Sequence, residues 1–221
     1  MLKLYYATGS CALASHIALE EAGARYEAVR LNFATNDQRK PEYLALNPKG
    51  RVPALVTERG VLTETPAILA FVAQTYPKAQ LAPRADAFAF ARVQAFNSYL
   101  CSTVHVAHAH KSRGYRWADD PDAIQAMREK VPVTIGECFE LMEREMFAGP
   151  WVMGDAYTIC DPYLFTLAQW LEGDGVDPAR FPKIHGHRSR MASRPAVKKV
   201  LAEVGHAVAR GGPTTIQGGS S

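Results

Sequence analysis

A turn with a potentially reactive side chain lies near the start of the chain, at Thr8-Gly9-Ser10-Cys11. It joins an expected strand to an expected helix, where free backbone N–H groups and the helix dipole favour an anion. A thiolate is such an anion, so we expect a lowered pKa and a reactive thiol at Cys11. Two alternatives remain open: Cys11 is an inert buried residue, and Ser10 only caps the helix.

A second feature is the Val52-Pro53 dipeptide at the start of an expected strand. In a trans peptide bond, Pro53 is a simple kink that cannot donate to the sheet. In a cis bond, the Val52 N–H and C=O turn away from the sheet. An extended peptide then pairs with them like an added strand, so this position favours a ligand with a peptide backbone.

The third feature is Glu64-Thr65, directly before a helix that Pro66 is expected to open. Thr65 suits the N-cap position and Pro66 suits the first helical position. In a binding role, Glu64 accepts from an ammonium group while Thr65 donates to a carboxylate at the helix N-terminus. Together they match the head of an amino acid, although capping alone also explains them.

These three features all lie at strand–helix junctions or strand starts, which is where α/β units bind ligands. In combination they predict a site for a short peptide. Its amino-acid head lies at one end and its sulfur lies near Cys11.

The elements that position this site follow from the chain's pattern. Residues 1–76 read strand–helix–strand, then an irregular piece, then strand–strand–helix. A linker is expected at 77–83, an all-helical domain with an acceptor-substrate pocket at 84–209, and a flexible tail at 210–221. One of the expected helices runs from about 123 to 146, with a kink or interruption at Pro132.

The composition sets limits on location and partners. The 221 residues carry a formal net charge of +3 from scattered groups, so no basic stripe points to nucleic acid. No apolar run is long enough for a membrane span, and the N-terminus does not read as a secretion signal. The four cysteines are widely spaced and are expected to be free thiols. We therefore expect a cytoplasmic protein with no membrane partner.

Four motifs, in order, resemble those of the glutathione transferase superfamily, most closely its bacterial beta class. They span nearly the whole chain, from Leu4 to about Glu203, and comprise Leu4 to Gly23, Leu46 to Leu55, Leu62 to Ile68, and Tyr157 to Phe165. In the last motif, Thr158 and Asp161 have the spacing of a capping box. The resemblance implies a thioredoxin-like N-terminal domain, an all-α helical bundle behind it, and a homodimer.

The resemblance also implies roles for single residues. Cys11 would lie beside the glutathione sulfur and form a mixed disulfide with it, while Val52 would bind the cysteinyl backbone next to a cis Pro53. Glu64 and Thr65 would hold the γ-glutamyl end. Asn97 resembles a residue that reaches glutathione in the partner subunit.

One departure from the beta class concerns the loop after the second strand. Members often carry a lysine there, aimed at the glycyl carboxylate, and Asn36 stands in its place. The acceptor pocket is assigned to His105, His108 and Tyr115, with His105 resembling a family histidine near the sulfur. His105 and His108 stand three apart, but no carboxylate or cysteine completes a metal site, so no metal is expected.

The resulting prediction is a glutathione transferase in detoxification, with glutathione as co-substrate and a hydrophobic acceptor. Cys11 and Ser10 are the catalytic candidates, and peroxidase or thiol–disulfide exchange activity is a further possibility. The main alternative is a non-catalytic binder of glutathione or hydrophobic ligands on the same fold. A third hypothesis is an isomerase or dehalogenase with one dedicated substrate.

Overall fold

The structure is a computed structural model that describes residues 1–205. The expected tail at 210–221 lies outside the described residues. No helix within 1–205 combines the length and the apolar character needed to cross a membrane.

The first part of the chain is a small α/β unit with a four-stranded sheet in the order β2-β1-β3-β4. Strand β1 pairs parallel with β2 and antiparallel with β3, and β3 pairs antiparallel with β4. This is the predicted thioredoxin-like arrangement. Its main elements are β1 (Leu2–Tyr6), α1 (Ala12–Glu21), β2 (Tyr26–Arg30), α2 (Pro41–Leu44), β3 (Ala54–Thr57), β4 (Gly60–Thr63) and α3 (Thr65–Thr75).

Local sequence explains why β1 and α1 form where they do. Leu4 and Tyr6 are buried on one face of β1, as the alternating pattern predicts. Gly23 follows α1 with φ of 63°, a left-handed conformation that glycine adopts without a steric penalty. The chain can therefore reverse at once into β2, which brings the two strands side by side.

The second part of the chain is helical. Its main elements are α4 (Ala87–Tyr99), a π-helical turn (Leu100–Val104), α5 (His105–Arg113), α6 (Pro121–Leu141), a second π-helical turn (Met142–Met146), α7 (Cys160–Ala168), α8 (Pro182–Ser193) and α9 (Pro195–Val204). The expected interruption at Pro132 is wrong, because α6 continues through it to Leu141. Val131, Ile135 and Phe139 are buried along one side of α6, and this packing outweighs the one missing hydrogen bond.

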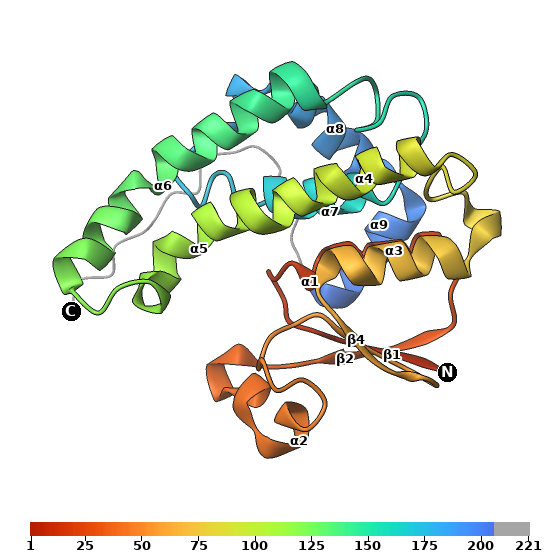
Figure 1. Cartoon of the computed structure of the whole chain (residues 1–221), viewed down its shortest axis with the longest axis horizontal. Coiled ribbons are helices and arrows are strands. Elements are labelled where there is room, and N and C mark those ends of the chain that lie inside the picture. The colour runs from red at the N-terminus through yellow and green to blue at the C-terminus, as the bar shows by residue number, and fades with distance from the viewer. Residues whose placement is uncertain (206–221) are drawn as a thin grey trace.

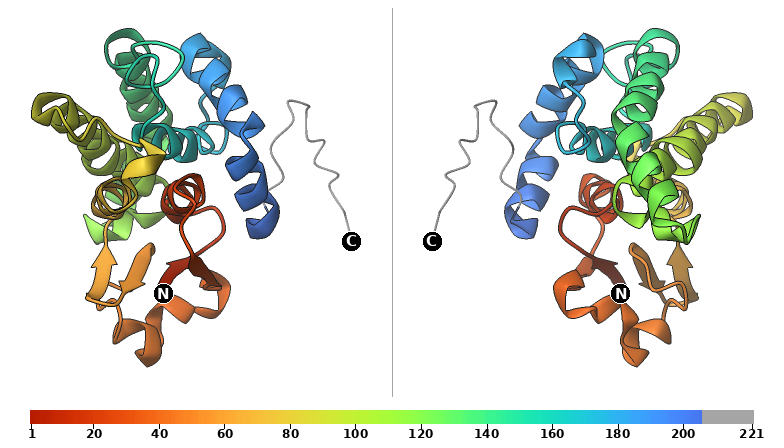
Figure 2. Two further views of the ribbon diagram at one scale, coloured as in Figure 1. Left: turned by 90° about the vertical axis from the view of Figure 1, so that its right-hand side faces the viewer. Right: turned by 90° about the vertical axis from the view of Figure 1, so that its left-hand side faces the viewer.

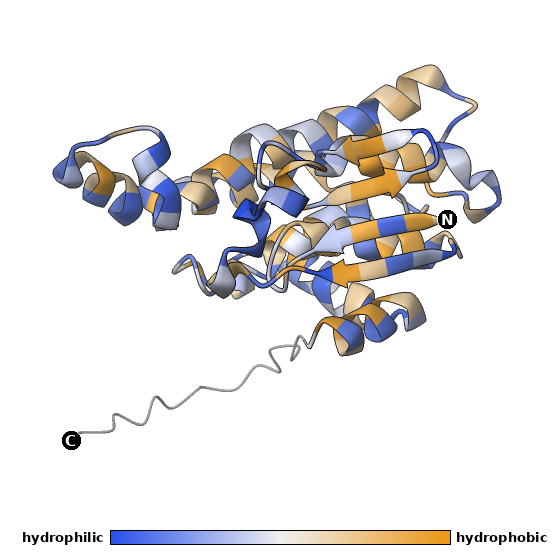
Figure 3. Ribbon diagram, turned by 90° about the horizontal axis from the view of Figure 1, so that it is seen from below, coloured by the Kyte–Doolittle hydropathy of each residue, from blue (hydrophilic) through white to orange (hydrophobic). Residues whose placement is uncertain are grey.

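The layers of the molecule place α1 between the sheet and the helical part (Figures 1 and 2). Helices α1 and α3 cover one face of the sheet. On the side of α1 that faces away from the sheet, α1 contacts α7 and α9. Helix α7 is buried along its entire length, so it forms the centre of the helical part. Figure 3 views the molecule from the sheet side and shows hydrophobic residues running along the strands.

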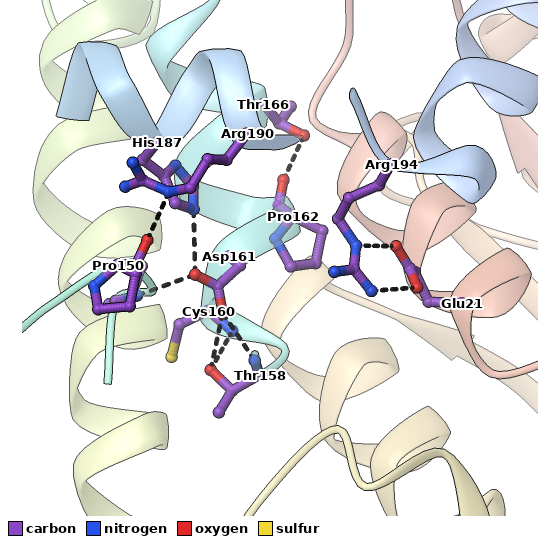
Figure 4. A network of polar contacts seen from close by, with 11 residues as sticks. Glu21, Pro150, Thr158, Cys160, Asp161, Pro162, Thr166, His187, Arg190 and Arg194 are labelled. Atoms are coloured by element: carbon purple, nitrogen blue, oxygen red, sulfur yellow. Dashed lines mark hydrogen bonds and ion pairs between the residues drawn. The ribbon is translucent and has the colours of Figure 1, made fainter. Parts of the chain in front are cut away.

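A buried carboxylate organises the start of α7 (Figure 4). Asp161 accepts from the backbone N–H of Thr158 at 2.6 Å and of Val152 at 2.9 Å, and its Oδ1 lies 3.0 Å from Nε2 of His187. The Asp161 half of the predicted capping box is confirmed. The Thr158 half differs, because its hydroxyl accepts from the N–H of Cys160, two residues on rather than three.

A second contact in Figure 4 ties the helical part to the α/β unit. Arg194, between α8 and α9, donates through two guanidinium nitrogens to the carboxylate of Glu21 at the end of α1, at 2.5 and 2.8 Å. A bidentate pair of this kind fixes orientation as well as distance. It helps hold α1, and with it the turn before α1, against the helical part.

Candidate functional site

A cavity of about 760 Å³ opens between the α/β unit and α5. The walls come from the β1–α1 turn, the loop after β2, the segment before β3, the start of α3, one face of α5 with the turn after it, and Trp170. The residues on these walls include Gly9, Ser10, Cys11, Asn36, Arg39, Arg51, Val52, Pro53, Glu64, Thr65, His105, His108, Arg113, Tyr115, Arg116 and Trp170. Every predicted site residue except Asn97 therefore lies on one cavity.

The β1–α1 turn places Ser10 and Cys11 differently. The Ser10 hydroxyl donates to the carbonyl of Ala7 at 2.6 Å and accepts from the N–H of Ala12 at 3.3 Å. The Cys11 thiol is buried and donates to the carbonyl of Val52 at 3.6 Å. The hydroxyl proton of Ser10 is therefore used on the backbone, whereas Cys11 points across the site toward the Val52-Pro53 segment.

The expected lowering of the Cys11 pKa is wrong. Burial raises the pKa of this thiol to about 11, and a hydrogen bond from Thr65 and the charge of Arg113 oppose the rise without overcoming it. The free-energy cost of removing a thiolate from water exceeds the stabilisation that the helix terminus, Thr65 and Arg113 provide. Without a ligand, Cys11 is therefore a protonated thiol at neutral pH.

The Val52-Pro53 peptide bond is cis. Both residues lie on the cavity wall, and Val52 is buried. The segment before them is anchored at the carbonyl of Arg51, which accepts from the Tyr43 hydroxyl at 2.6 Å and from the Asn47 side-chain amide at 2.7 Å. The position of the Val52 backbone is thus fixed by its neighbours.

Glu64 has an unusual backbone conformation, with φ of 70° and ψ of 123°. A positive φ is costly for a residue with a side chain, and such conformations cluster at functional sites. Helix α3 starts at Thr65, one residue earlier than predicted, so Glu64 rather than Thr65 is the N-cap residue. Thr65 is buried at the first helical position and still faces the cavity.

Lys49 is a neighbour of this pair that sequence reasoning missed. Its ammonium forms an ion pair with Glu64 and donates to the Thr63 hydroxyl at 2.6 Å. Lys49 belongs to the Asn47-Pro48-Lys49-Gly50 turn, but a turn position gives no sign of a partner 15 residues away. Only the pairing of β3 with β4 brings the two segments together.

The helical wall is built around Trp170. Its indole stacks on the ring of His108, with centroids 4.1 Å apart, and its Nε1 donates to the carbonyl of Gly9 at 3.2 Å. His108 Nδ1 lies 2.7 Å from a carboxylate oxygen of the buried Asp174. This carboxylate fixes the ring, and the indole links the wall to the turn that carries Cys11.

His105 faces the same cavity in a neutral form. Burial lowers its pKa to about 4, and the charge of Arg113 lowers it further. Tyr115 lies at the rim, 60% exposed. Within 1–205, no group of three or more His, Cys, Asp and Glu side chains is arranged to hold a metal ion.

Asn97 is not brought into the cavity. Its side chain on α4 is fully buried, and neither amide atom has a hydrogen-bond partner in the described part of the chain. A contact from Asn97 to glutathione in a partner subunit stays a prediction.

Four arginines also lie on the cavity: Arg39, Arg51, Arg113 and Arg116. None of them is a predicted site residue. A signal was present for Arg113, which lies eight residues after His105 on the same helix and so within the same apolar-stripe spacing. Arg116 lies beyond the end of α5, in the turn Gly114–Arg116.

Comparisons with known proteins agree with this architecture. The glutathione S-transferase N-terminal domain model matches residues 1–74, and the C-terminal domain model matches residues 96–195. A solved glutathione transferase homologue from Sulfitobacter, with bound glutathione, is 46% identical with a TM-score of 0.89, covering 92% of this chain and 98% of that one. The chain belongs to the glutathione transferase family.

Two further members of the family match at lower identity. A bacterial beta class glutathione S-transferase from Sphingomonas chungbukensis is 31% identical with a TM-score of 0.79, over 92% of this chain and 98% of that one. Glutathione S-transferase GstA of Escherichia coli O157:H7 is 29% identical over 206 residues, which cover 92% of this chain and 99% of the relative. The predicted family, fold and enzyme class are confirmed for this glutathione transferase.

Proposed function

We propose that this glutathione transferase binds glutathione in the cavity and uses its thiol to attack an electrophilic acceptor. The observation that carries the proposal is the convergence of Cys11, Val52, Glu64 and Thr65 on one cavity. These residues come from three separate segments, and each segment matches one part of an extended tripeptide. Glutathione bound to the Sulfitobacter homologue supports the same ligand.

The γ-glutamyl end fits the start of α3. The carboxylate would accept from the free N–H groups of that helix, near Thr65, and the ammonium would lie against Glu64. Lys49 now pairs with Glu64, but both side chains are about half exposed, so Lys49 can move aside at small cost.

The other end of the tripeptide fits the side of the cavity with Asn36, Arg39 and Arg51. The loop position that matches the lysine of other beta class members is Asn36, and Lys40, further along the same loop, pairs with Asp37 and does not line the cavity. We assign the glycyl carboxylate to the guanidinium groups of Arg39 and Arg51, which supply the charge that the loop lysine supplies in other beta class members.

Cys11 is assigned the role of hydrogen-bond donor to the glutathione thiolate. Its raised pKa keeps the proton on its sulfur, and a bound thiolate is an acceptor for that proton. The Ser10 proton is already used on Ala7. In conjugation, the thiolate sulfur bonds to the electrophilic carbon, the leaving group takes the electron pair of the broken bond, and the thiol proton goes to solvent.

The test is calorimetric titration of the reduced protein with glutathione, followed by a panel of electrophiles, peroxides and disulfides. Saturable binding at about one site per chain and turnover of an electrophile are expected. Binding without any turnover would favour the non-catalytic binder, and no binding at millimolar glutathione would refute the proposal. Light scattering would test the proposed homodimer.

A further inference from the structure

The charge of the cavity does not match a purely hydrophobic acceptor. Its described walls carry four guanidinium groups and a single carboxylate, that of Glu64. None of the four arginines forms an ion pair with a residue in the range 1–205. The Glu64 carboxylate is itself paired with Lys49, so it does not neutralise any of them.

Arg113 is the least compensated of the four. It lies in the last turn of α5, on the face that also carries His105, and its Nε is buried without a hydrogen-bond partner in the described chain. Burial and the neighbouring Arg116 lower its pKa. Its charge acts on both Cys11 and His105, which places it on the sulfur side of the cavity.

Bound glutathione does not neutralise all of the positive charge of the four arginines. With its thiol ionised, it brings two carboxylates, one thiolate and one ammonium group. Glu64 offsets the ammonium, and the three anions balance three of the guanidinium groups. The sum leaves one positive charge. The glycyl carboxylate is placed at Arg39 and Arg51 and the γ-glutamyl carboxylate at the start of α3, so the thiolate is the one anion of glutathione that faces Arg113 and Arg116, and it cannot balance both.

An uncharged acceptor would leave the positive charge near Arg113 and Arg116 unbalanced. It would displace water from Arg113 and leave a guanidinium without partners in a closed site, which is costly. A carboxylate has the opposite effect, because its two oxygens match the guanidinium fork. Tyr115, whose ring lies 6.0 Å from the Arg116 guanidinium carbon, provides an aromatic surface for the rest of the molecule.

We propose that the acceptor of this enzyme carries a carboxylate, which Arg113 binds with help from Arg116 while the glutathione sulfur attacks the electrophilic carbon. This inference rests on the proposed function and names the acceptor class for the same site. It replaces the hydrophobic acceptor expected from the family resemblance with an aromatic or unsaturated acid.

Two probes that differ only in charge test the proposal: 4-chloro-3,5-dinitrobenzoate and its methyl ester. In both, the glutathione sulfur bonds to the ring carbon that carries chlorine, the carbon–chlorine bond breaks, and chloride leaves with the electron pair. The thiol proton goes to the buffer. For each probe, kcat/KM is divided by the uncatalysed rate constant, which removes the difference in intrinsic reactivity.

We expect the wild-type enzyme to prefer the carboxylate over the ester by about 10-fold or more, the range for one charge-assisted hydrogen-bonded pair. Arg113→Gln should reduce that preference about 10-fold, and Arg116→Gln should reduce it less. Arg92→Gln removes an exposed arginine of α4 outside the cavity and should leave the preference unchanged. High salt should also reduce the preference in the wild type.

The outcomes separate this inference from the proposed function. Glutathione binding and ester turnover with no preference for the carboxylate would overturn the acid acceptor and leave the transferase intact. No glutathione binding would overturn the transferase itself. If Arg113→Gln fails to fold, the wild-type ratio and the Arg116→Gln ratio still decide, because a preference insensitive to Arg116 and to salt contradicts the proposal.

Discussion

Replacing Glu64 with glutamine isolates the contact between this residue and the glutathione ammonium. Glutamine keeps the shape of the side chain and the same backbone conformation, so the positive φ at this position is equally costly in both proteins. What changes is the charge. The substitution also releases Lys49 from its ion pair, which must be included in the expected result.

The size of the expected loss of glutathione affinity follows from the solvent exposure of the Glu64 side chain. A hydrogen bond to a charged group contributes about 1.5–3 kcal/mol, but the Glu64 side chain is 56% exposed and Lys49 competes for it. An exposed pair of this kind is worth about 0.2–1 kcal/mol, and losing it offsets part of the effect. The net loss of glutathione affinity should therefore be about 1 kcal/mol, or roughly 5-fold in Kd.

Calorimetry with two ligands checks the reasoning. One is glutathione, and the other is glutaryl-cysteinylglycine, which lacks only the α-ammonium group. The wild-type protein should bind glutathione about 5-fold more tightly than the analogue, and Glu64→Gln should bind the two equally. Equal loss of affinity for both ligands in the variant would refute the contact, because the effect would then not depend on the ammonium group.

Three further predictions concern residues in and behind the site. Cys11→Ala should lose more thiol–disulfide exchange activity than conjugation activity. Wild-type Cys11 should be alkylated by iodoacetamide slowly at pH 7 and faster as the pH rises toward about 11. Fast alkylation at pH 7 would contradict the raised pKa. Lys49→Met should tighten glutathione binding about 2- to 5-fold, since Glu64 is freed for the ammonium; weaker binding would mean that Lys49 contacts the ligand. Asp161→Asn should lower the free energy of unfolding by about 2–3 kcal/mol in urea titrations, because an amide N–H₂ would face buried donors. Asp155→Asn, an exposed control, should change it by less than about 0.5 kcal/mol, and equal losses in the two variants would argue against the buried network.

The parts of the fold that sequence predicted are those set by local chemistry. Gly23 closes α1 because glycine alone adopts its conformation freely, and the strand–helix–strand order follows from the period of the apolar residues. The resemblance to a family supplied the cis bond before Pro53. Each of these depends on neighbours within a few positions or on a motif.

The parts that sequence reasoning missed depend on contacts between distant segments. The protonation state of Cys11 depends on its burial under α5 and α3, which the turn motif alone does not reveal. Continuation of α6 past Pro132 is decided by packing on one side of the helix. Burial of Asn97 is decided by what covers α4, so the likeness to a ligand-binding residue was not enough to place its side chain.

The hydrogen bond from Trp170 to Gly9 has a consequence for how this enzyme could acquire new substrates. The indole is at once a wall of the cavity and a support for the loop that carries Cys11. A substitution that enlarges the pocket at this position also frees the loop. Substrate range and thiol activation therefore cannot be varied independently through Trp170, whereas changes at exposed Tyr115 leave the loop untouched.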